Sequence, residues 1–218
     1  MRYSRCRDIF GEDGFSRLSE ARVLILGVGG VGSFVLDCLY RSGLRDITIV
    51  DCDIYEESNR NRQIGADGAV GECKVSTLSS LYPGVESIHC RMDREWAESF
   101  DFDPYDVVVD AVDTTSVKLA VAKRCYRKLI MSMGSARRMD PTRIKVASVW
   151  KSQGDALARK IRNSLKKERF DRNFTVVFSD EQPVCDGKGS FVAVTGAFGL
   201  FICAETVKKI LNSTQRRG

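Results

Sequence analysis

Residues 22–63 read RVLILGVGGVGSFVLDCLYRSGLRDITIVDCDIYEESNRNRQ, and this stretch decides the fold class. The short apolar run over 23–26 is typical of a buried strand, and it leads into the pattern G-x-G-x-x-G at Gly27, Gly29 and Gly32. This spacing predicts a tight turn that brings bare backbone N–H groups to the start of a helix, where a phosphate is favoured. The stretch therefore predicts a nucleotide-binding turn.

The residues after the turn continue this unit. A helix is expected from Gly30 to Ser42 and a second strand from Ile47 to Val50, with Asp51 at the carboxyl end of that strand. In doubly wound sheets an acidic residue at this point accepts hydrogen bonds from a ribose hydroxyl. A dehydrogenase would use the same glycines and the same aspartate, so nicotinamide binding and ATP binding both stay open here.

Strands and helices go on alternating as far as about residue 134. The apolar runs and their Gly and Pro boundaries predict a helix over 71–81, a strand over 87–91, a helix over 94–100, a strand over 105–110, a helix over 117–128 and a strand over 130–132. This alternation predicts an α/β, Rossmann-like, doubly wound fold, in which a mainly parallel sheet carries helices on both faces.

The last part of the chain is less regular. It is expected to hold a strand over 143–150, a strongly basic helix over 155–169, a strand over 175–179 and a closing apolar helix over 191–211. Because no repeat or interdomain linker interrupts the sequence, we expect a single domain over 1–218. Residues 1–135 would be its nucleotide-binding core, and residues 136–218 an elaboration that binds the substrate and closes the fold.

The composition is that of an ordinary folded protein, with 43% hydrophobic and 29% charged residues among 218. A net charge of +5 permits an anionic partner without indicating nucleic acid by itself. The eight cysteines include no C-x-x-C pair, which argues against a structural zinc site and a disulfide framework. The N-terminus has no signal-type apolar core, and the apolar run 191–204 is too short to span a bilayer. We therefore expect a cytoplasmic protein with no membrane span.

Two polar segments indicate phosphate chemistry. The run Ser58-Asn59-Arg60-Asn61-Arg62-Gln63 follows the acidic strand end, and Lys74 comes soon after it. Arginine binds phosphate bidentately, whereas lysine binds it as a point charge. Asp110 and Asp113 follow a central strand, at the edge where ligands of open α/β sheets bind. Asp113 is the stronger candidate for a Mg²⁺ ligand, and Asp110 is alternatively a helix cap or a strand-end carboxylate without a ligand.

Residues 2–135 resemble the adenylating domain of the ubiquitin-activating-like enzymes, the ThiF, MoeB and HesA superfamily. The segments that carry the resemblance occur in order as R-Y-S-R, G-V-G-G-V-G, V-D-C-D, S-N-R-N-R-Q, Lys74 and D-A-V-D. The resemblance implies that a carboxylate attacks the α-phosphate of ATP to give an acyl-adenylate and pyrophosphate. The ATP site that it implies comprises Gly27, Gly29, Gly30, Gly32, Asp51, Asp53, Asn59, Arg62 and Lys74.

The same resemblance implies individual roles. Asp51 would hold the ribose, Arg62 and Lys74 would bind the triphosphate and stabilise the attack, and Asp113 would hold Mg²⁺. Arg62, Lys74 and Asp113 are thus the expected catalytic residues. Arg5 would reach across a homodimer into the ATP site of the partner subunit.

The remaining sequence resembles one branch of this superfamily, the tRNA threonylcarbamoyladenosine dehydratases. The similar segments are S-A-R-R-M-D-P-T-R-I-K-V, the basic helix, V-F-S-D-E-Q and the terminal helix. The resemblance implies activation of the threonyl carboxylate of threonylcarbamoyladenosine in tRNA, then ring closure with net loss of water. Ten basic residues cluster in this third of the chain, and beside this resemblance they indicate a surface that binds tRNA. The expected tRNA-binding residues are Arg137, Arg138, Arg159, Lys160, Arg162, Lys166, Lys167 and Arg169, and the cluster also contains Arg143 and Arg172.

Some alternatives stay open. Cys185 precedes the terminal helix, and it is either a nucleophile that forms a thioester from the acyl-adenylate or an incidental cysteine. The substrate is alternatively the C-terminus of a ubiquitin-like sulfur carrier, although activators of that kind usually bear paired C-x-x-C zinc ligands that this sequence lacks. A non-catalytic NAD-binding module is a further alternative, and a sulfur-transfer or electron-transfer accessory protein is a possible partner.

Overall fold

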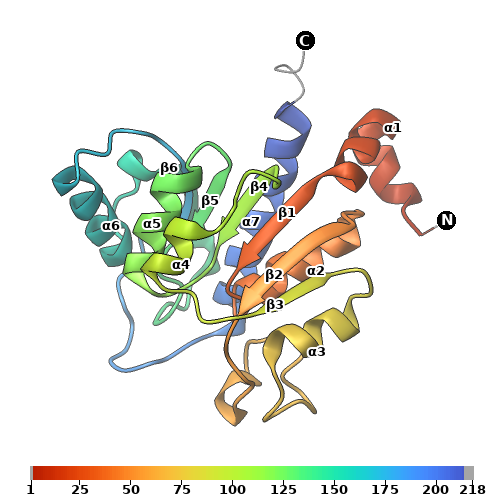
Figure 1. Cartoon of the computed structure of the whole chain (residues 1–218). Helices are drawn as coiled ribbons and strands as arrows, with labels where there is room; N and C mark the ends of the chain where they lie inside the picture. The colour runs from red at the N-terminus through yellow and green to blue at the C-terminus, as the bar shows by residue number, and fades with distance from the viewer. Residues whose placement is uncertain (1, 214–218) are drawn as a thin grey trace.

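The computed structural model describes residues 2–213, which form one seven-stranded sheet in the order β3-β2-β1-β4-β5-β7-β6 (Figure 1). Within this sheet of the described residues, β6 and β7 pair antiparallel, and all other neighbouring strands pair parallel. Helices cover both faces of the sheet, so the Rossmann-like fold class expected from the sequence is confirmed. The strands are β1 (Arg22–Leu26), β2 (Asp46–Asp51), β3 (Glu86–His89), β4 (Val107–Asp110), β5 (Leu129–Ser132), β6 (Ile144–Ser148) and β7 (Thr175–Ser179).

Seven α-helices connect or flank these strands within the described residues. They are α1 (Ser4–Glu20), α2 (Gly32–Ser42), α3 (Lys74–Leu81), α4 (Arg94–Ser99), α5 (Thr115–Cys125), α6 (Ala156–Lys167) and α7 (Val192–Asn212). None of these helices is long and apolar enough to cross a membrane. The polar sequence Gln215-Arg216-Arg217-Gly218 suggests a disordered end, and these four residues lie outside the described part of the chain.

The sheet divides the interior into two apolar cores. Because side chains alternate along a strand, Val23 and Ile25 of β1 enter the core beneath α2 and α7, whereas Leu24 and Leu26 enter the core beneath α4, α5 and α6. All four side chains are fully buried. Burial on both faces explains why the central strands read as continuous apolar runs in the sequence.

The terminal helix α7 joins the end of the chain to its beginning. It packs against α2, the helix that follows the glycine turn, and two glycines allow a close approach. A Cβ at Gly199 would lie 2.6 Å from the Cβ of Phe34, and one at Gly196 would lie 3.3 Å from the Phe34 ring. The sheet likewise takes strands from both 1–135 and 136–218.

Two of the boundaries that differ from those expected have a clear cause in the backbone. The helix predicted from Gly71 begins at Lys74, since Gly71 has a φ of +92° and Cys73 is extended. The strand predicted to reach residue 150 ends at Ser148, because residues 149–151 turn into a short 3₁₀ helix. The helix α1, which precedes the first strand, kinks at Gly11, which has a φ of +70°.

Candidate functional site

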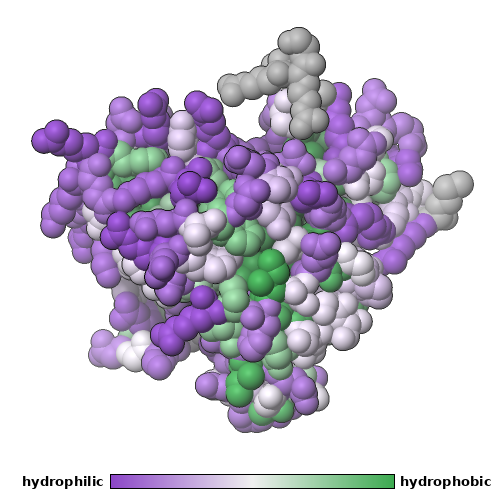
Figure 2. All heavy atoms as spheres, in the orientation of Figure 1, coloured by the Kyte–Doolittle hydropathy of each residue, from purple (hydrophilic) through white to green (hydrophobic). Residues whose placement is uncertain are grey.

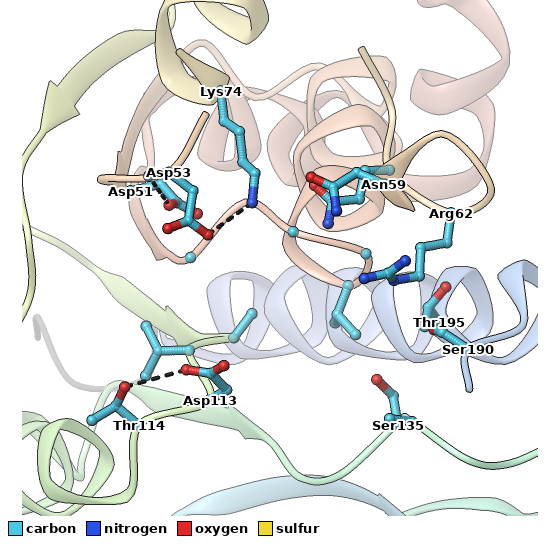
Figure 3. Close-up of a pocket in the computed structure, with 18 of the residues that line it drawn as sticks. Asp51, Asp53, Asn59, Arg62, Lys74, Asp113, Thr114, Ser135, Ser190 and Thr195 are labelled. Atoms are coloured by element: carbon cyan, nitrogen blue, oxygen red, sulfur yellow. Dashed lines mark hydrogen bonds and ion pairs between the residues drawn. The ribbon is translucent and has the colours of Figure 1, made fainter. Parts of the chain in front are cut away.

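A cavity of about 860 Å³ opens at the carboxyl ends of the central strands, as expected for an open α/β sheet. Its lining includes Gly27, Gly29 and Gly30 of the glycine turn. It also takes in residues from four other segments: Asp51, Asp53, Asn59, Arg62, Lys74, Asp113, Thr114, Ser135, Ser190 and Thr195. Figure 3 shows Asp51, Asp53 and Lys74 on one side of this cavity, Asp113 and Thr114 across from them, and Arg62 beside Ser190 and Thr195.

The glycine turn is as tight as its spacing predicts. The Gly27 N–H donates to the Val50 carbonyl at 2.8 Å, and Gly27 has a φ of +83°, which disfavours any other residue. A Cβ at Gly32 would lie 1.9 Å from the Gly27 carbonyl oxygen, so no side chain fits there. The first turn of α2 can therefore close directly behind the glycines, so that the N-terminal end of the helix, which favours an anion, begins at the turn.

Asp51 ends β2 and is only 8% exposed. One carboxylate oxygen accepts from the Val28 N–H at 2.8 Å, and the other accepts from the Asp53 N–H at 2.9 Å. These two bonds fix the carboxylate against the glycine turn, and each oxygen keeps a further lone pair for a ligand hydroxyl. The position suits a nucleotide ribose.

Two cationic side chains line the cavity, Lys74 and Arg62, and different contacts hold each of them in place. The Lys74 side chain is 6% exposed, and its ammonium pairs with the Asp53 carboxylate at 2.9 Å. Arg62 donates from Nη1 to the Ser58 carbonyl at 2.8 Å and to the Asn61 side chain at 2.9 Å. Within residues 2–213 the Arg62 guanidinium makes these two hydrogen bonds, so Nε and Nη2 retain N–H groups for a phosphate.

Asn59 shapes the loop that carries Arg62. Its buried side chain accepts from the Glu56 N–H at 3.1 Å, and this bond completes a reciprocal cap on the short helix over residues 57–59. Asn59 also lines the cavity. Its structural role is therefore explicit, and a contact with nucleotide remains a prediction.

The two aspartates after β4 have different surroundings. Asp113 is exposed to the cavity, and one of its oxygens accepts from the Thr114 hydroxyl at 3.2 Å. Asp110 is fully buried and pairs with Lys118 at 3.0 Å. Burial raises the pKa of Asp110, and the Lys118 ammonium opposes that shift. Asp110 is thus a strand-end carboxylate beneath the site, which was one of the two alternatives to a metal ligand that the sequence offered for it.

A family model matches the sequence of the chain to a known group of proteins. The model described as the ThiF family matches residues 3–217. The chain belongs to the ThiF family. The expected resemblance to that superfamily is thereby confirmed over nearly the whole chain.

Several relatives of this ThiF-family chain carry the same name. The tRNA threonylcarbamoyladenosine dehydratase of Bacillus subtilis is 37% identical over 193 residues, which are 84% of this chain and 76% of that protein. Its Haemophilus influenzae counterpart is 28% identical over 97% of this chain and 94% of that protein. The Escherichia coli tRNA N6-threonylcarbamoyladenosine dehydratase, solved in complex with ATP, matches with a TM-score of 0.91 at 29% identity, covering 100% of this chain and 96% of that one. The same E. coli protein has been solved with AMP.

Some lining residues of the ThiF-family site were not anticipated. Arg91 and Met92 follow β3, and Ser135 and Ala136 follow β5. The rule that ligands bind at carboxyl strand ends would have pointed to all four. Lys188, Ser190 and Thr195 enter from the loop before α7 and from its first turn, a region that carries no motif. Only the three-dimensional packing of α7 against α2 brings these residues to the cavity.

The cysteines near this cavity differ in place and in state. Cys52 lines the cavity, and burial together with the carboxylates of Asp53 and Asp51 raises its pKa, so it is not an activated thiolate. Cys185 is exposed on the loop before α7 and is not among the lining residues. All eight cysteines of the chain are free. The position of Cys185 favours the incidental alternative, which a variant must test.

The predicted tRNA-binding residues fall into two groups. Arg159, Lys160, Lys166 and Lys167 are exposed on α6, opposite its buried Ile161 and Leu165, and Arg137 and Arg169 are exposed in loops. Figure 2 shows hydrophilic side chains gathered over the side of the molecule where Figure 1 places α6.

Two predicted tRNA-binding residues have other partners. Arg138 is 7% exposed; its guanidinium pairs with Asp155 at 2.7 Å and donates to the carbonyls of Gly134 and Glu181. Arg162 donates to Ser152. We leave Arg138 out of the proposed tRNA surface, because a buried guanidinium with three partners is not free to meet a phosphate.

Arg5 lies on α1 and is exposed, outside the lining of the cavity of its own chain. A role at the site would require a second subunit. The assignment to the partner's ATP site therefore stays a prediction.

Proposed function

We propose that the chain is an ATP-dependent tRNA threonylcarbamoyladenosine dehydratase. The observation that supports this most is a single cavity that brings Arg62, the Lys74–Asp53 pair and Asp113 around the glycine turn. The relatives with this name, and the ATP and AMP complexes of the E. coli protein, favour it over the nicotinamide module. They also favour it over activation of a sulfur carrier.

The reaction proceeds in two displacements. The threonyl carboxylate attacks the α-phosphate of ATP. A bond forms between a carboxylate oxygen and the α-phosphorus, the bond from the α-phosphorus to the oxygen that bridges to the β-phosphate breaks, and pyrophosphate leaves with that oxygen. A nucleophile of the modified base then attacks the acyl carbon, closes the ring and displaces AMP with the former carboxylate oxygen. A proton is lost from the nucleophile, so the tRNA loses one water in total. Adenylation is needed because a carboxylate oxygen is otherwise a poor leaving group.

The protein contributes mainly position and charge. The free N–H groups of Arg62 face the cavity and would bind the oxygens of the phosphate under attack, on which negative charge accumulates. Lys74 is held by Asp53 and would reach the triphosphate as a point charge. Asp51 would fix the ribose, so that the α-phosphate meets the carboxylate in line.

The donor set at Asp113 fits Mg²⁺. One exposed carboxylate in the nucleotide cavity, with one oxygen outside the bond to Thr114, matches the preference of this ion for one or two carboxylates together with substrate phosphates. When bound, Mg²⁺ would neutralise charge on the departing pyrophosphate. Asp113 would hold it there.

The decisive experiment uses tRNA bearing threonylcarbamoyladenosine, ATP and Mg²⁺. After incubation with the purified chain, the nucleosides are released and weighed by mass spectrometry. We expect the modified adenosine to lose the mass of one water in an ATP-dependent manner, with AMP and pyrophosphate formed. An unchanged nucleoside would contradict the proposal, and ATP–pyrophosphate exchange seen only with a small protein carrier would favour the sulfur-carrier alternative.

The tRNA would lie over α6 and the loop at Arg137. Arg137 follows the lining residue Ala136, so it is the predicted cation nearest to the cavity along the chain. Lys166 and Lys167 end the 12-residue α6, roughly 18 Å from its start at 1.5 Å per residue. A tRNA is long enough to contact the loop at Arg137 and the end of α6 at the same time.

We expect the double variant Lys166→Glu/Lys167→Glu to bind tRNA about tenfold more weakly and to lower the salt dependence of binding by about two released ions, since each lysine would contact one phosphate. Filter binding across a salt series measures both quantities, and ATP binding should not change. The control is Lys208→Glu, which alters an exposed lysine on α7. Equal tRNA affinity for the double variant and wild type would remove α6 from the tRNA surface.

The variant Cys185→Ala should cyclise the modified tRNA at a rate within about twofold of wild type, because the thiol lies outside the lining of the cavity. Single-turnover kinetics with the nucleoside mass readout measures this. A loss of about 10²-fold or more, together with a thioester trapped in the wild-type chain, would instead establish covalent catalysis.

Three further expectations remain predictions. They are a homodimer that places Arg5 in the partner's site, a sulfur-transfer or electron-transfer accessory protein, and a cytoplasmic location. The first is tested by sedimentation and by mixing an Arg5→Ala chain with an Arg62→Met chain, since active sites shared between subunits would regain partial activity.

A further inference from the structure

A buried ion pair lies directly beneath the segment that carries Asp113. Asp110 at the end of β4 and Lys118 in α5 are both 0% exposed, and Lys118 Nζ lies 3.0 Å from Asp110 Oδ1. The ammonium also donates to the Ser132 carbonyl at the end of β5, at 2.8 Å. One side chain thus connects two strand ends with the first turns of α5.

This pair controls the backbone between Asp110 and Asp113. Asp110 Oδ1 also accepts from the Val112 N–H at 3.1 Å, so the carboxylate fixes the turn that leads to Asp113. At the other end, the Lys118 N–H donates to the Thr114 carbonyl at 3.1 Å, the first hydrogen bond of α5. Residues 111–114 are therefore held at one end by the Asp110 carboxylate and at the other end by the first turn of α5, which contains Lys118.

The same segment also touches the glycine turn. The Ala111 N–H donates to the Leu26 carbonyl at 2.8 Å, and a Cβ at Gly27 would lie 3.0 Å from the Ala111 carbonyl. Any shift of residues 111–113 would thus change the separation of Asp113 from the phosphate-binding turn. Figure 3 shows Asp113 on this segment, across the cavity from Lys74 and Asp53.

The pair is an expensive way to stabilise a fold. Removing two charges from water usually costs more than their attraction returns, and apolar residues of similar size are often at least as stable. Asp110 Oδ2 is moreover one of two buried side-chain polar atoms without a hydrogen-bond partner within residues 2–213. The other is Oε1 of Gln63, a residue that lines the same cavity. Such incompletely satisfied groups call for a reason other than stability.

We infer that Asp110 and Lys118 are positioning residues, which set the backbone of residues 111–114 and so aim the Asp113 carboxylate at a divalent cation on the nucleotide. The inference rests on the proposed function, because that function places the cation at Asp113. Neither residue touches the nucleotide, and both act through the segment between them. Groups that orient a metal ligand typically alter metal affinity 10–100-fold when they are removed.

The test separates metal affinity from stability. The double variant Asp110→Leu/Lys118→Met replaces the pair with apolar side chains and so leaves no unpaired buried charge. It should fold with a somewhat lower melting temperature than wild type, because the Val112 N–H and the Ser132 carbonyl lose the partners that the pair supplies. Binding of Mn²⁺ to the chain with a non-hydrolysable ATP analogue, followed by electron paramagnetic resonance, should weaken about 10–100-fold. Affinity for the analogue in EDTA, followed by calorimetry, should stay close to that of wild type. A folded double variant with wild-type Mn²⁺ affinity would overturn the inference.

A milder variant and a control complete the design. Asp110→Asn keeps an oxygen for the Val112 N–H, so it should retain part of the Mn²⁺ affinity; if the double variant does not fold, wild-type Mn²⁺ affinity in Asp110→Asn overturns the inference. Lys128→Met is the control, because Lys128 likewise binds carbonyls, those of Phe102 and Asp103, but away from Asp113. It should lower the melting temperature and leave Mn²⁺ binding unchanged.

These measurements contain no tRNA, so the two proposals can fail separately. A wild-type chain that binds Mn²⁺ with the analogue but leaves modified tRNA unchanged would contradict the proposed function alone. If the wild-type chain bound the analogue with the same affinity in Mn²⁺ and in EDTA, both the assignment of Asp113 as a metal ligand and the inference about the Asp110–Lys118 pair would be overturned.

Discussion

Replacing Arg62 with methionine should slow AMP formation on modified tRNA by about 10²–10³-fold, as removal of one preorganised donor to developing charge commonly does. Methionine is chosen because the Arg62 stem packs over Gly30, where a Cβ would lie 3.3 Å from Arg62 Cγ. The substitution therefore removes the charge and keeps most of the packing. Pre-steady-state measurement of AMP release separates this chemical step from tRNA binding.

The matched control for Arg62→Met is Arg60→Met, two positions away in the same loop. Arg60 is neutralised by Glu57 at 2.6 Å and Asp67 at 2.8 Å, and it does not line the cavity. We expect Arg60→Met to react at the wild-type rate. Arg62→Lys should recover only part of the loss, because an ammonium cannot bind phosphate bidentately. Equal rates for the two methionine variants would exclude Arg62 from the reaction.

Much of this site could be predicted because short local signals determine it. The glycine spacing, the acidic end of β2 and the arginine loop each follow a strand end, and parallel strands bring their carboxyl ends to one edge. The structure accordingly collects Asp51, Arg62, Lys74 and Asp113 around one cavity.

The remainder depends on contacts between distant segments, which local patterns do not encode. The sequence predicts the same exposed, tRNA-binding position for Arg138 as for its neighbour Arg137, but the Arg138 side chain is buried because it pairs with Asp155, 17 residues later. Lys118 belongs to no sequence motif, yet it is fully buried against Asp110 and Ser132. Thr195 reaches the cavity only because α7 folds back onto α2. In each case the partner, rather than the residue itself, decides the environment.

The second large effect is expected at Gly32. A Cβ there would lie 1.9 Å from the Gly27 carbonyl oxygen and 2.9 Å from the Gly27 carbonyl carbon, both of which are backbone atoms. No side-chain rotation can relieve this overlap, so Gly32→Ala must displace either the glycine turn or the start of α2. Overpacking of this kind costs about 3 kcal/mol or more, a large fraction of the 5–15 kcal/mol that stabilises a typical domain.

Gly29→Ala provides the comparison within the same motif. Its Cβ would meet only the Gln63 side-chain nitrogen at 3.7 Å, an ordinary contact, and the turn backbone would not have to move. Chemical denaturation should therefore show a large loss of unfolding free energy for Gly32→Ala and little change for Gly29→Ala. ATP should raise the melting temperature of Gly29→Ala less than that of wild type, since the added methyl group enters the cavity where the phosphates would lie. The explanation that glycine is required at position 32 by the close approach of α2 to the turn would be contradicted if Gly32→Ala were as stable as wild type and retained ATP binding.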